Sequence, residues 1–179
     1  PDLWNNLKKF VQTGDFTLGK ELTKFEKKFA KLIGTKYAVG VNSGTDAIKL
    51  SLKVLNIKPG DEVITAANTF VATVGAIREL GAIPIFVDCD DTFCMNVDLV
   101  EKKITKKTKA LVPVHFTGYM TNMVKLNKIS KKYNIPIVED ACQSILASIN
   151  QKNSGTWSNF GAFSLHPLKN INVWSDGGI

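Results

Sequence analysis

The chain has 179 residues, 44% of them hydrophobic and 22% charged, which is the balance of a globular protein with one substantial domain. The net charge of +7 comes almost wholly from lysine, and eight of the lysines form the pairs Lys27-Lys28, Lys102-Lys103, Lys106-Lys107 and Lys131-Lys132. These pairs lack the interleaved aromatic residues or glycines of a nucleic-acid-binding surface, so they indicate solvated helix faces. No run approaches the roughly 18 apolar residues that cross a bilayer, and no apolar signal-peptide core follows Lys8 and Lys9, so we expect no membrane segment and a cytoplasmic location.

Two amphipathic helices are predicted at the start of the chain. Apolar residues recur at helical spacing over residues 3–11, and the glycine-bounded segment 14–19 ends this pattern. A second helix is expected over residues 21–32, with apolar residues on one face and lysines on the other, and Gly34 ends it.

From Tyr37 onward, short apolar runs alternate with helical patterns. Strands are expected at 37–41, 62–65, 83–87, 110–114 and 135–138, and helices at 45–55, 69–80, 97–104 and 122–133. The apolar runs do not alternate with polar residues, as in strands that are covered on both faces. This rhythm predicts an α/β fold, a three-layer α/β/α sandwich around a mostly parallel sheet. Three prolines conflict with the expected strand boundaries, because proline donates no ladder hydrogen bond (Pro84, Pro113 and Pro136).

Cysteine and histidine usage argues against a metal site. Cys89, Cys94 and Cys142 are an odd number without a C-x-x-C pair, which favours free thiols in a reducing compartment. Neither His115 nor His166 has a carboxylate at helical ligand spacing, so we expect no metal.

A glycine-containing turn lies between a predicted strand and a predicted helix. Ser43, Gly44 and Thr45 place free backbone N–H groups at a helix N-terminus, where phosphate binds well. An ordinary N-cap gives the same pattern. The G-x-G-x-x-G, P-loop and G-x-S-x-G motifs are absent, so a dinucleotide site, a P-loop and a hydrolase elbow have no support.

A carboxylate and a lysine near the end of the chain complete the candidate site. Asp140 follows the strand ending at Val138, at the carboxyl edge where open α/β sheets bind ligands, although it could instead cap a helix. Lys169 lies in a loop rich in Ser, Pro and Asn, where most lysines are simply solvated. Pyridoxal phosphate (PLP) chemistry needs such a pair, a lysine that holds the aldehyde as a Schiff base and a carboxylate that keeps the pyridine ring protonated.

The combination of motifs, in one order, is more specific than any one of them. The motifs are Ser43-Gly44-Thr45, Gly60-Asp61-Glu62-Val63-Ile64, Thr69-Phe70-Val71-Ala72-Thr73, Val114-His115-Phe116-Thr117-Gly118, Glu139-Asp140-Ala141-Cys142-Gln143, and Phe163-Ser164 followed by Lys169-Asn170 and Gly177-Gly178. From about Gly19 to its end the chain closely resembles the DegT/DnrJ/StrS family, the PLP-dependent sugar aminotransferases with the aspartate-aminotransferase fold (fold type I).

The resemblance implies a role for each residue of the candidate site. Lys169 would form the Schiff base and then shuttle protons, Asp140 would pair with the pyridine nitrogen, and Gln143 would hydrogen-bond the phenolic oxygen of the cofactor. Phe70 would stack on the ring. The phosphate cup would be formed by Ser43, Gly44, Thr45 and the Ser164 hydroxyl. Cys142 replaces a more usual alanine, which we expect to be harmless, and His115 matches a family position without an assigned role.

The resemblance also implies how this chain relates to a whole enzyme. Residues 1–179 would be a single, partial PLP-binding large domain, and the small C-terminal domain would be absent from this chain. Such enzymes are homodimers with a shared active site, in which the second subunit donates a residue to the cofactor phosphate. A chain ending at Ile179 is about half of such a protein, either a fragment or a truncated gene product, and we expect it to be inactive alone.

The implied function is transfer of an amino group from an amino acid, typically glutamate, to a nucleotide-linked keto-sugar in amino sugar biosynthesis. One alternative is a sugar dehydratase of the same family, which uses the amine form of the cofactor. That branch carries histidine in place of the lysine, so Lys169 argues against it, although His166 lies close by. Another alternative is a non-catalytic protein that keeps the fold and binds only cofactor or a partner. The sequence does not identify the sugar, the ring carbon or the nucleotide.

Overall fold

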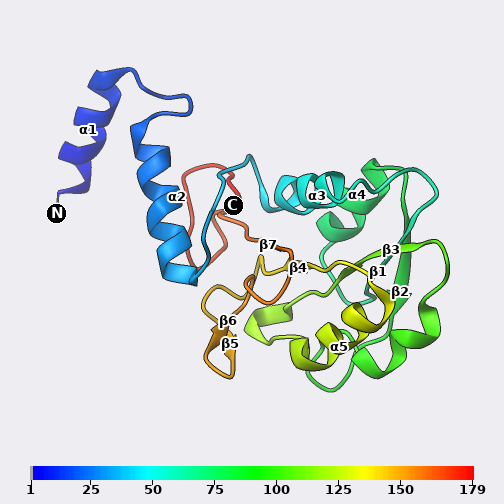
Figure 1. Ribbon diagram of the computed structural model, residues 1–179. Coiled ribbons are helices and arrows are strands. Elements are labelled where there is room, and N and C mark those ends of the chain that lie inside the picture. Colours follow the sequence, from blue (N-terminus) through cyan, green and yellow to red (C-terminus); the bar gives the residue numbers. More distant parts are fainter. Residues whose placement is uncertain (1) are drawn as a thin grey trace.

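The computed structural model describes residues 2–179, in which a mostly parallel sheet lies between two layers of helices and two further helices stand at its side (Figure 1). The longer helices are α1 (Leu3–Thr13), α2 (Lys20–Ile33), α3 (Gly44–Val54), α4 (Val71–Glu79) and α5 (Met123–Tyr133). The strands are β1 (Glu62–Ala66), β2 (Ile83–Val87), β3 (Thr108–Val112), β4 (Val138–Asp140), β5 (Ser148–Ile149), β6 (Lys152–Asn153) and β7 (Phe160–Ala162).

The main sheet has two parallel parts that meet between β3 and β4. The first part has the order β2-β1-β3 and the second pairs β4 with β7. Parallel bridges from Leu111 to Ile137 and from Val114 to Asp140 join them. The resulting order is β2-β1-β3-β4-β7, so the carboxyl ends of all five strands lie at one edge.

The end of the chain adds an antiparallel segment to this layer. Residues 177–179 run beside the chain after β7, and the backbones of Phe163 and Ile179 exchange two hydrogen bonds. On its other side, Gly178 exchanges two hydrogen bonds with Val41. A Cβ on Gly178 would lie 2.2 Å from the carbonyl oxygen of Ser43, so only glycine allows this approach.

Alternate residues of the central strand enter two separate cores. On β1, Val63 packs in a cluster with residues of α3 and α4, whereas its neighbour Ile64 packs in a cluster with residues of α5. Both side chains are fully buried. The sheet is therefore covered on both faces, and the predicted α/β sandwich with a mostly parallel sheet is confirmed.

The first two helices contribute less to these cores. Helix α1 has no buried residue, and Figure 1 shows it at the end of the molecule farthest from α5. Its Trp4 ring lies 5.9 Å from that of Trp174. Helix α2 is tied in more firmly, because Phe29 packs edge-on against Phe163 with 5.2 Å between ring centroids.

Four predicted elements differ from the structure. Residues 37–41 form no strand and pair only at Val41, and residues 97–104 form two 3₁₀ turns, Val97–Leu99 and Glu101–Lys103, in place of one helix. The strand expected at 110–114 is β3, two residues earlier. The strand expected at 135–138 is β4, which begins at Val138, because Pro136 has no N–H to donate.

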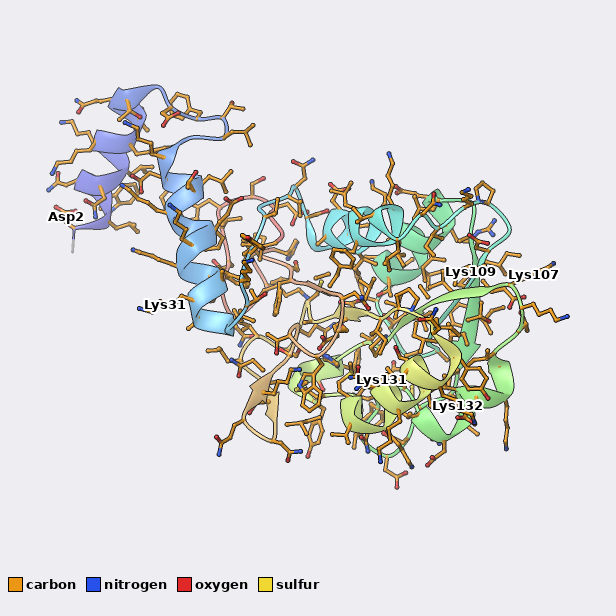
Figure 2. All side chains as sticks on the ribbon, viewed as in Figure 1. Asp2, Lys31, Lys107, Lys109, Lys131 and Lys132 are labelled. Carbon is orange, nitrogen blue, oxygen red and sulfur yellow. The ribbon has the colours of Figure 1, made fainter. Side chains whose placement is uncertain are left out.

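The paired lysines are all exposed, as predicted for solvated faces. Figure 2 shows lysines that project outward, some from these pairs and some not: Lys31 near the end of α2, Lys107 and Lys109 at the start of β3, and Lys131 and Lys132 near the end of α5. Within residues 2–179, no helix is long and apolar enough to span a membrane.

Candidate active site

A cavity of about 350 Å³ opens at the carboxyl ends of the parallel strands. Its walls are the N-termini of α3 and α4, the chain after β4 and the loop after β7. All eight residues predicted for the site line this cavity: Ser43, Gly44, Thr45, Phe70, Asp140, Gln143, Ser164 and Lys169. The topology thus brings together four segments that are far apart in the sequence, and the volume is in the usual range for small-molecule sites.

The N-terminus of α3 presents free backbone donors to the cavity. Ser43 caps the helix, and its hydroxyl accepts a hydrogen bond from the N–H of Asp46 at 3.1 Å. Among residues 2–179, nothing accepts a hydrogen bond from the N–H of Gly44 or of Thr45. Two free donors at the positive end of a helix dipole form a good site for a phosphate group.

Gly44 is also needed for close packing at this helix end. A Cβ there would lie 2.7 Å from Cys142 Sγ and 2.8 Å from Ser164 Cβ. We expect Gly44→Ala to lower the free energy of unfolding by about 1–3 kcal/mol, because the surrounding chain must move apart. Gly75→Ala is the matched control, since nothing lies within 4 Å of its Cβ and alanine in α4 should stabilise by about 0.5–1 kcal/mol. Urea unfolding of both variants checks this, and equal stabilities would contradict it.

Asp140 is held at its place by the sheet and by hydrogen bonds to both carboxylate oxygens. Its backbone N–H donates to Pro113 and its carbonyl accepts from His115, at 2.9 and 3.0 Å. Its Oδ1 accepts from the N–H of Cys142 at 3.2 Å, and its Oδ2 accepts from the hydroxyl of Thr73 at 2.6 Å. The side chain is only 5% exposed. A buried carboxylate in a cavity without an ion pair is suited to bind a cationic or protonated group.

Lys169 lines the same cavity and has no ion-pair partner among the described residues. The thiol of Cys142 is affected by both charged groups of the site. Burial raises the pKa of this thiol well above its usual value, the Asp140 carboxylate raises it further, and the Lys169 ammonium opposes the shift. Cys142 therefore remains a protonated thiol at neutral pH and serves as packing.

The other predicted residues have free polar or aromatic groups in the cavity. The amide oxygen of Gln143 accepts from the N–H of Thr117 at 3.0 Å, so its amide NH₂ remains available to donate. The hydroxyl oxygen of Ser164 accepts from the N–H of His166, so its proton also remains available. Phe70, the N-cap residue of α4, is 66% exposed and can cover a bound ring.

These groups fit PLP by their chemistry. The cofactor has a phosphate, a ring nitrogen that becomes protonated, and an aldehyde that reacts with an amine. The cavity offers free N–H donors at a helix N-terminus, a buried carboxylate and an unpaired lysine, one for each of these groups. The predicted binding roles of the individual residues remain predictions.

His115 and Glu139 form a buried polar network on the opposite face of the sheet from Asp140. Both side chains are fully buried, with 3.0 Å between His115 Nε2 and Glu139 Oε2. Because Nδ1 of His115 accepts from the N–H of Thr121, Nε2 is the nitrogen that donates to Glu139. Glu139 also accepts from Gly155 N, Trp157 N and Ser158 Oγ. This network fixes the turn that enters β7 and therefore has a structural role.

Two residues with a clear structural role, Thr73 and Glu139, are not among the predicted site residues. Thr73 stands in one of the sequence motifs, and its hydroxyl donates a hydrogen bond to Asp140. A signal existed, since Thr69 and Thr73 are four residues apart on one helix face. Glu139 was likewise noted only in a motif, although a charged residue at the end of an apolar strand run indicates a buried polar network.

Solved structures with the same fold include a sugar aminotransferase in its PLP form and a sugar dehydratase. The protein ntda from Bacillus subtilis, crystallised with the bound cofactor PMP, is 38% identical with a TM-score of 0.92, and the match covers 98% of this chain and 40% of that one. A GDP-4-keto-6-deoxymannose-3-dehydratase with bound GDP-perosamine is 31% identical with a TM-score of 0.91, and the match covers 98% of this chain and 47% of that one. These likenesses define the chain as part of an α/β protein with the PLP-dependent aminotransferase fold.

The family of the chain is shown by a match that extends over nearly its whole length. The model of the DegT/DnrJ/EryC1/StrS aminotransferase family matches residues 2–179, and the chain belongs to this PLP-dependent family. A Streptomyces venezuelae relative, dTDP-3-amino-3,4,6-trideoxy-alpha-D-glucose transaminase, is 41% identical over 169 residues, which are 94% of this chain and 45% of the relative. The chain spans about half the length of the curated relatives it matches.

Proposed function

We propose that the protein containing this chain is a PLP-dependent transaminase that moves an amino group from glutamate to a nucleotide-linked keto-sugar. The observation that carries this proposal is the meeting of Lys169, Asp140 and the free N–H groups of α3 in one cavity. The transaminase names of close relatives support it, including one that acts on a UDP-linked sugar.

Each side chain has a separate task in this proposal. When bound, PLP supplies an electron sink for the carbon that gains or loses the amino group. Lys169 anchors the cofactor and moves a proton between carbon and nitrogen through its Nζ. Asp140 holds the proton at the pyridine nitrogen. The N-terminus of α3 binds the phosphate, and Gln143 donates its amide N–H to the phenolic oxygen.

A second subunit would complete the site. Two apolar side chains that line the cavity are exposed, Phe70 at 66% and Leu168 at 86%. Such exposed apolar groups favour burial against another chain. This supports the homodimer with a shared active site that the family resemblance implies. Three free cysteines fit a reducing compartment such as the cytoplasm.

The test is product analysis on the protein in its longest natural form. With PLP, glutamate and UDP- or dTDP-linked 3-keto-sugars, we expect an amino sugar and 2-oxoglutarate in equal amounts. Because one relative is a 3-oxo-glucose-6-phosphate:glutamate aminotransferase, the sugar phosphate is assayed in parallel. No amino sugar from any of these acceptors, with PLP bound, would contradict the proposal and favour the non-catalytic alternative.

The sugar dehydratase remains the second candidate because His166 also lines the cavity. Its Nδ1 accepts a hydrogen bond from the N–H of Leu168 at 3.2 Å, so Nε2 carries the proton in the neutral ring. Formation of a deoxygenated sugar in place of an amino sugar would identify this activity.

A further inference from the structure

Two threonine hydroxyls form a row of hydrogen bonds that ends on Asp140. The oxygen of Thr73 lies 2.6 Å from Oδ2 of Asp140, and the oxygens of Thr69 and Thr73 lie 2.7 Å apart. Thr73 is 1% exposed and Asp140 is 5% exposed. The two partners are 67 residues apart in the sequence, since Thr73 lies in α4 and Asp140 ends β4.

Which group donates in each of these hydrogen bonds follows from the protons that each group carries. An ionised carboxylate can only accept, so Thr73 donates its single hydroxyl proton to Asp140. The oxygen of Thr73 is then left as an acceptor, and Thr69 donates to it. The proton of Thr69 is thereby directed to Thr73 and not to the carbonyl of Phe70, which is more distant at 3.4 Å.

This arrangement fixes Asp140 from both sides. One carboxylate oxygen accepts from Thr73 on α4, and the other accepts from the backbone N–H of Cys142. A hydroxyl that donates to a buried carboxylate stabilises the anion and holds its plane. The first turn of α4 carries both Thr73 and Phe70, so one helix places the partner of the carboxylate and the aromatic face of the cavity.

We propose that Thr73 is a positioning residue that holds the Asp140 carboxylate oriented toward the ring nitrogen of PLP, with Thr69 orienting Thr73. This inference rests on the proposed function, because it assumes that PLP occupies the cavity. Thr73 does not touch the reacting carbon and acts only through Asp140. Its hydroxyl therefore affects how strongly the ring nitrogen keeps its proton.

The test compares three variants of the protein in its longest natural form. Thr73→Val removes the hydroxyl at nearly constant volume, and Thr73→Ser keeps it. Thr65→Val is the matched control, because Thr65 is fully buried and its hydroxyl donates to the Val112 carbonyl at 2.8 Å outside the cavity. The readouts are the dissociation constant of PLP and the ¹⁵N chemical shift of its pyridine nitrogen in ¹⁵N-labelled cofactor.

We expect Thr73→Val to weaken PLP binding by about tenfold, the effect of one hydrogen bond to a charged group, and to move the ¹⁵N shift toward the unprotonated ring. Thr73→Ser should restore both values to within about threefold of wild type. Wild-type values in folded Thr73→Val, or the same change in Thr65→Val, would overturn the positioning role alone. A wild-type protein that takes up no PLP would overturn the proposed function together with it.

Discussion

Replacing Lys169 with alanine is expected to abolish covalent attachment of PLP and to lower transamination by at least about 10³-fold. Among the described residues that line the cavity, Lys169 is the only lysine, and no carboxylate competes for its ammonium group. The variant therefore loses the anchor and the proton carrier together, and general acid–base catalysis alone contributes about 10²–10⁴-fold.

The measurement is a visible absorption spectrum with added PLP, followed by borohydride reduction and peptide mapping. The wild-type protein should show a band that reduction fixes on Lys169, and the variant should show none. Lys109→Ala is the matched control, because this exposed lysine lies at the start of β3, at the opposite edge of the sheet from the cavity. A visible band retained in Lys169→Ala, or fixed on another lysine, would refute the assignment.

The strands β1 and β2 were predictable because each is a short run of mostly apolar residues bounded by turn residues. β1 is almost wholly buried, as expected for a strand inside a parallel sheet. Pro84 lies inside β2 without disrupting the sheet, since β2 is at its edge and pairs only with β1. Local pattern therefore located these strands to within one residue.

Elements that depend on distant partners were not predictable in the same way. The apolar run at residues 37–41 has the composition of a strand, yet only Val41 finds a partner, in Gly178. β7 was missed because it is short and contains Gly161, which has weak strand propensity. It exists because β4 lies beside it and supplies the ladder.

The segment at residues 97–104 shows the limit of periodicity. Its apolar spacing suits a helix, but Asn96 caps a single 3₁₀ turn and a second turn follows after Val100. Eight residues gain few helical hydrogen bonds after a costly first turn. The two turns still bury Val97 and Val100 against the core of the α5 face, so the periodicity identified the buried residues and not the type of helix.

The residues of the candidate site likewise differ in whether local sequence alone predicts them. Asp140 follows from the rule that parallel strands present their carboxyl ends at one edge, and the turn at residues 43–45 follows from its place at the N-terminus of α3. The partners that make Asp140 useful do not follow from that rule. Thr73 donates to it across 67 residues, and only the tertiary fold brings the Thr73 hydroxyl within 2.6 Å of Oδ2 of Asp140.

Replacing Glu139 with glutamine is expected to lower the free energy of unfolding by about 3 kcal/mol, a large share of the usual 5–15 kcal/mol. The change removes one acceptor oxygen and adds an NH₂ group in a site where a backbone N–H donates to each carboxylate oxygen. Oε1 accepts from Trp157 N and Oε2 accepts from Gly155 N, both at 2.8 Å. Backbone N–H groups cannot reverse their role, so either orientation of the amide leaves one buried donor unpaired, at a cost of about 1–3 kcal/mol.

The control for this prediction is the same substitution at Glu62, also a strand carboxylate. Its Oε2 accepts from the hydroxyls of Thr105 and Thr108, at 2.5 and 3.4 Å. Hydroxyls rotate and can accept from an amide, so Glu62→Gln should change stability by less than about 0.5 kcal/mol. Urea unfolding measures both variants, and an equal loss at the two positions would show that the donors around Glu139 do not decide its stability.

The Glu139→Gln substitution should also affect the cavity, although the Glu139 carboxylate lies on the opposite face of the sheet. Its donors, Gly155, Trp157 and Ser158, belong to the turn that enters β7, and β7 leads directly to Ser164 and the loop of Lys169. Glu139 pairs with Gly161 in the ladder between β4 and β7, so loss of the turn frees the strand at its start. We therefore expect Glu139→Gln to weaken PLP binding as well, whereas Glu62→Gln, at the start of β1, should leave it unchanged.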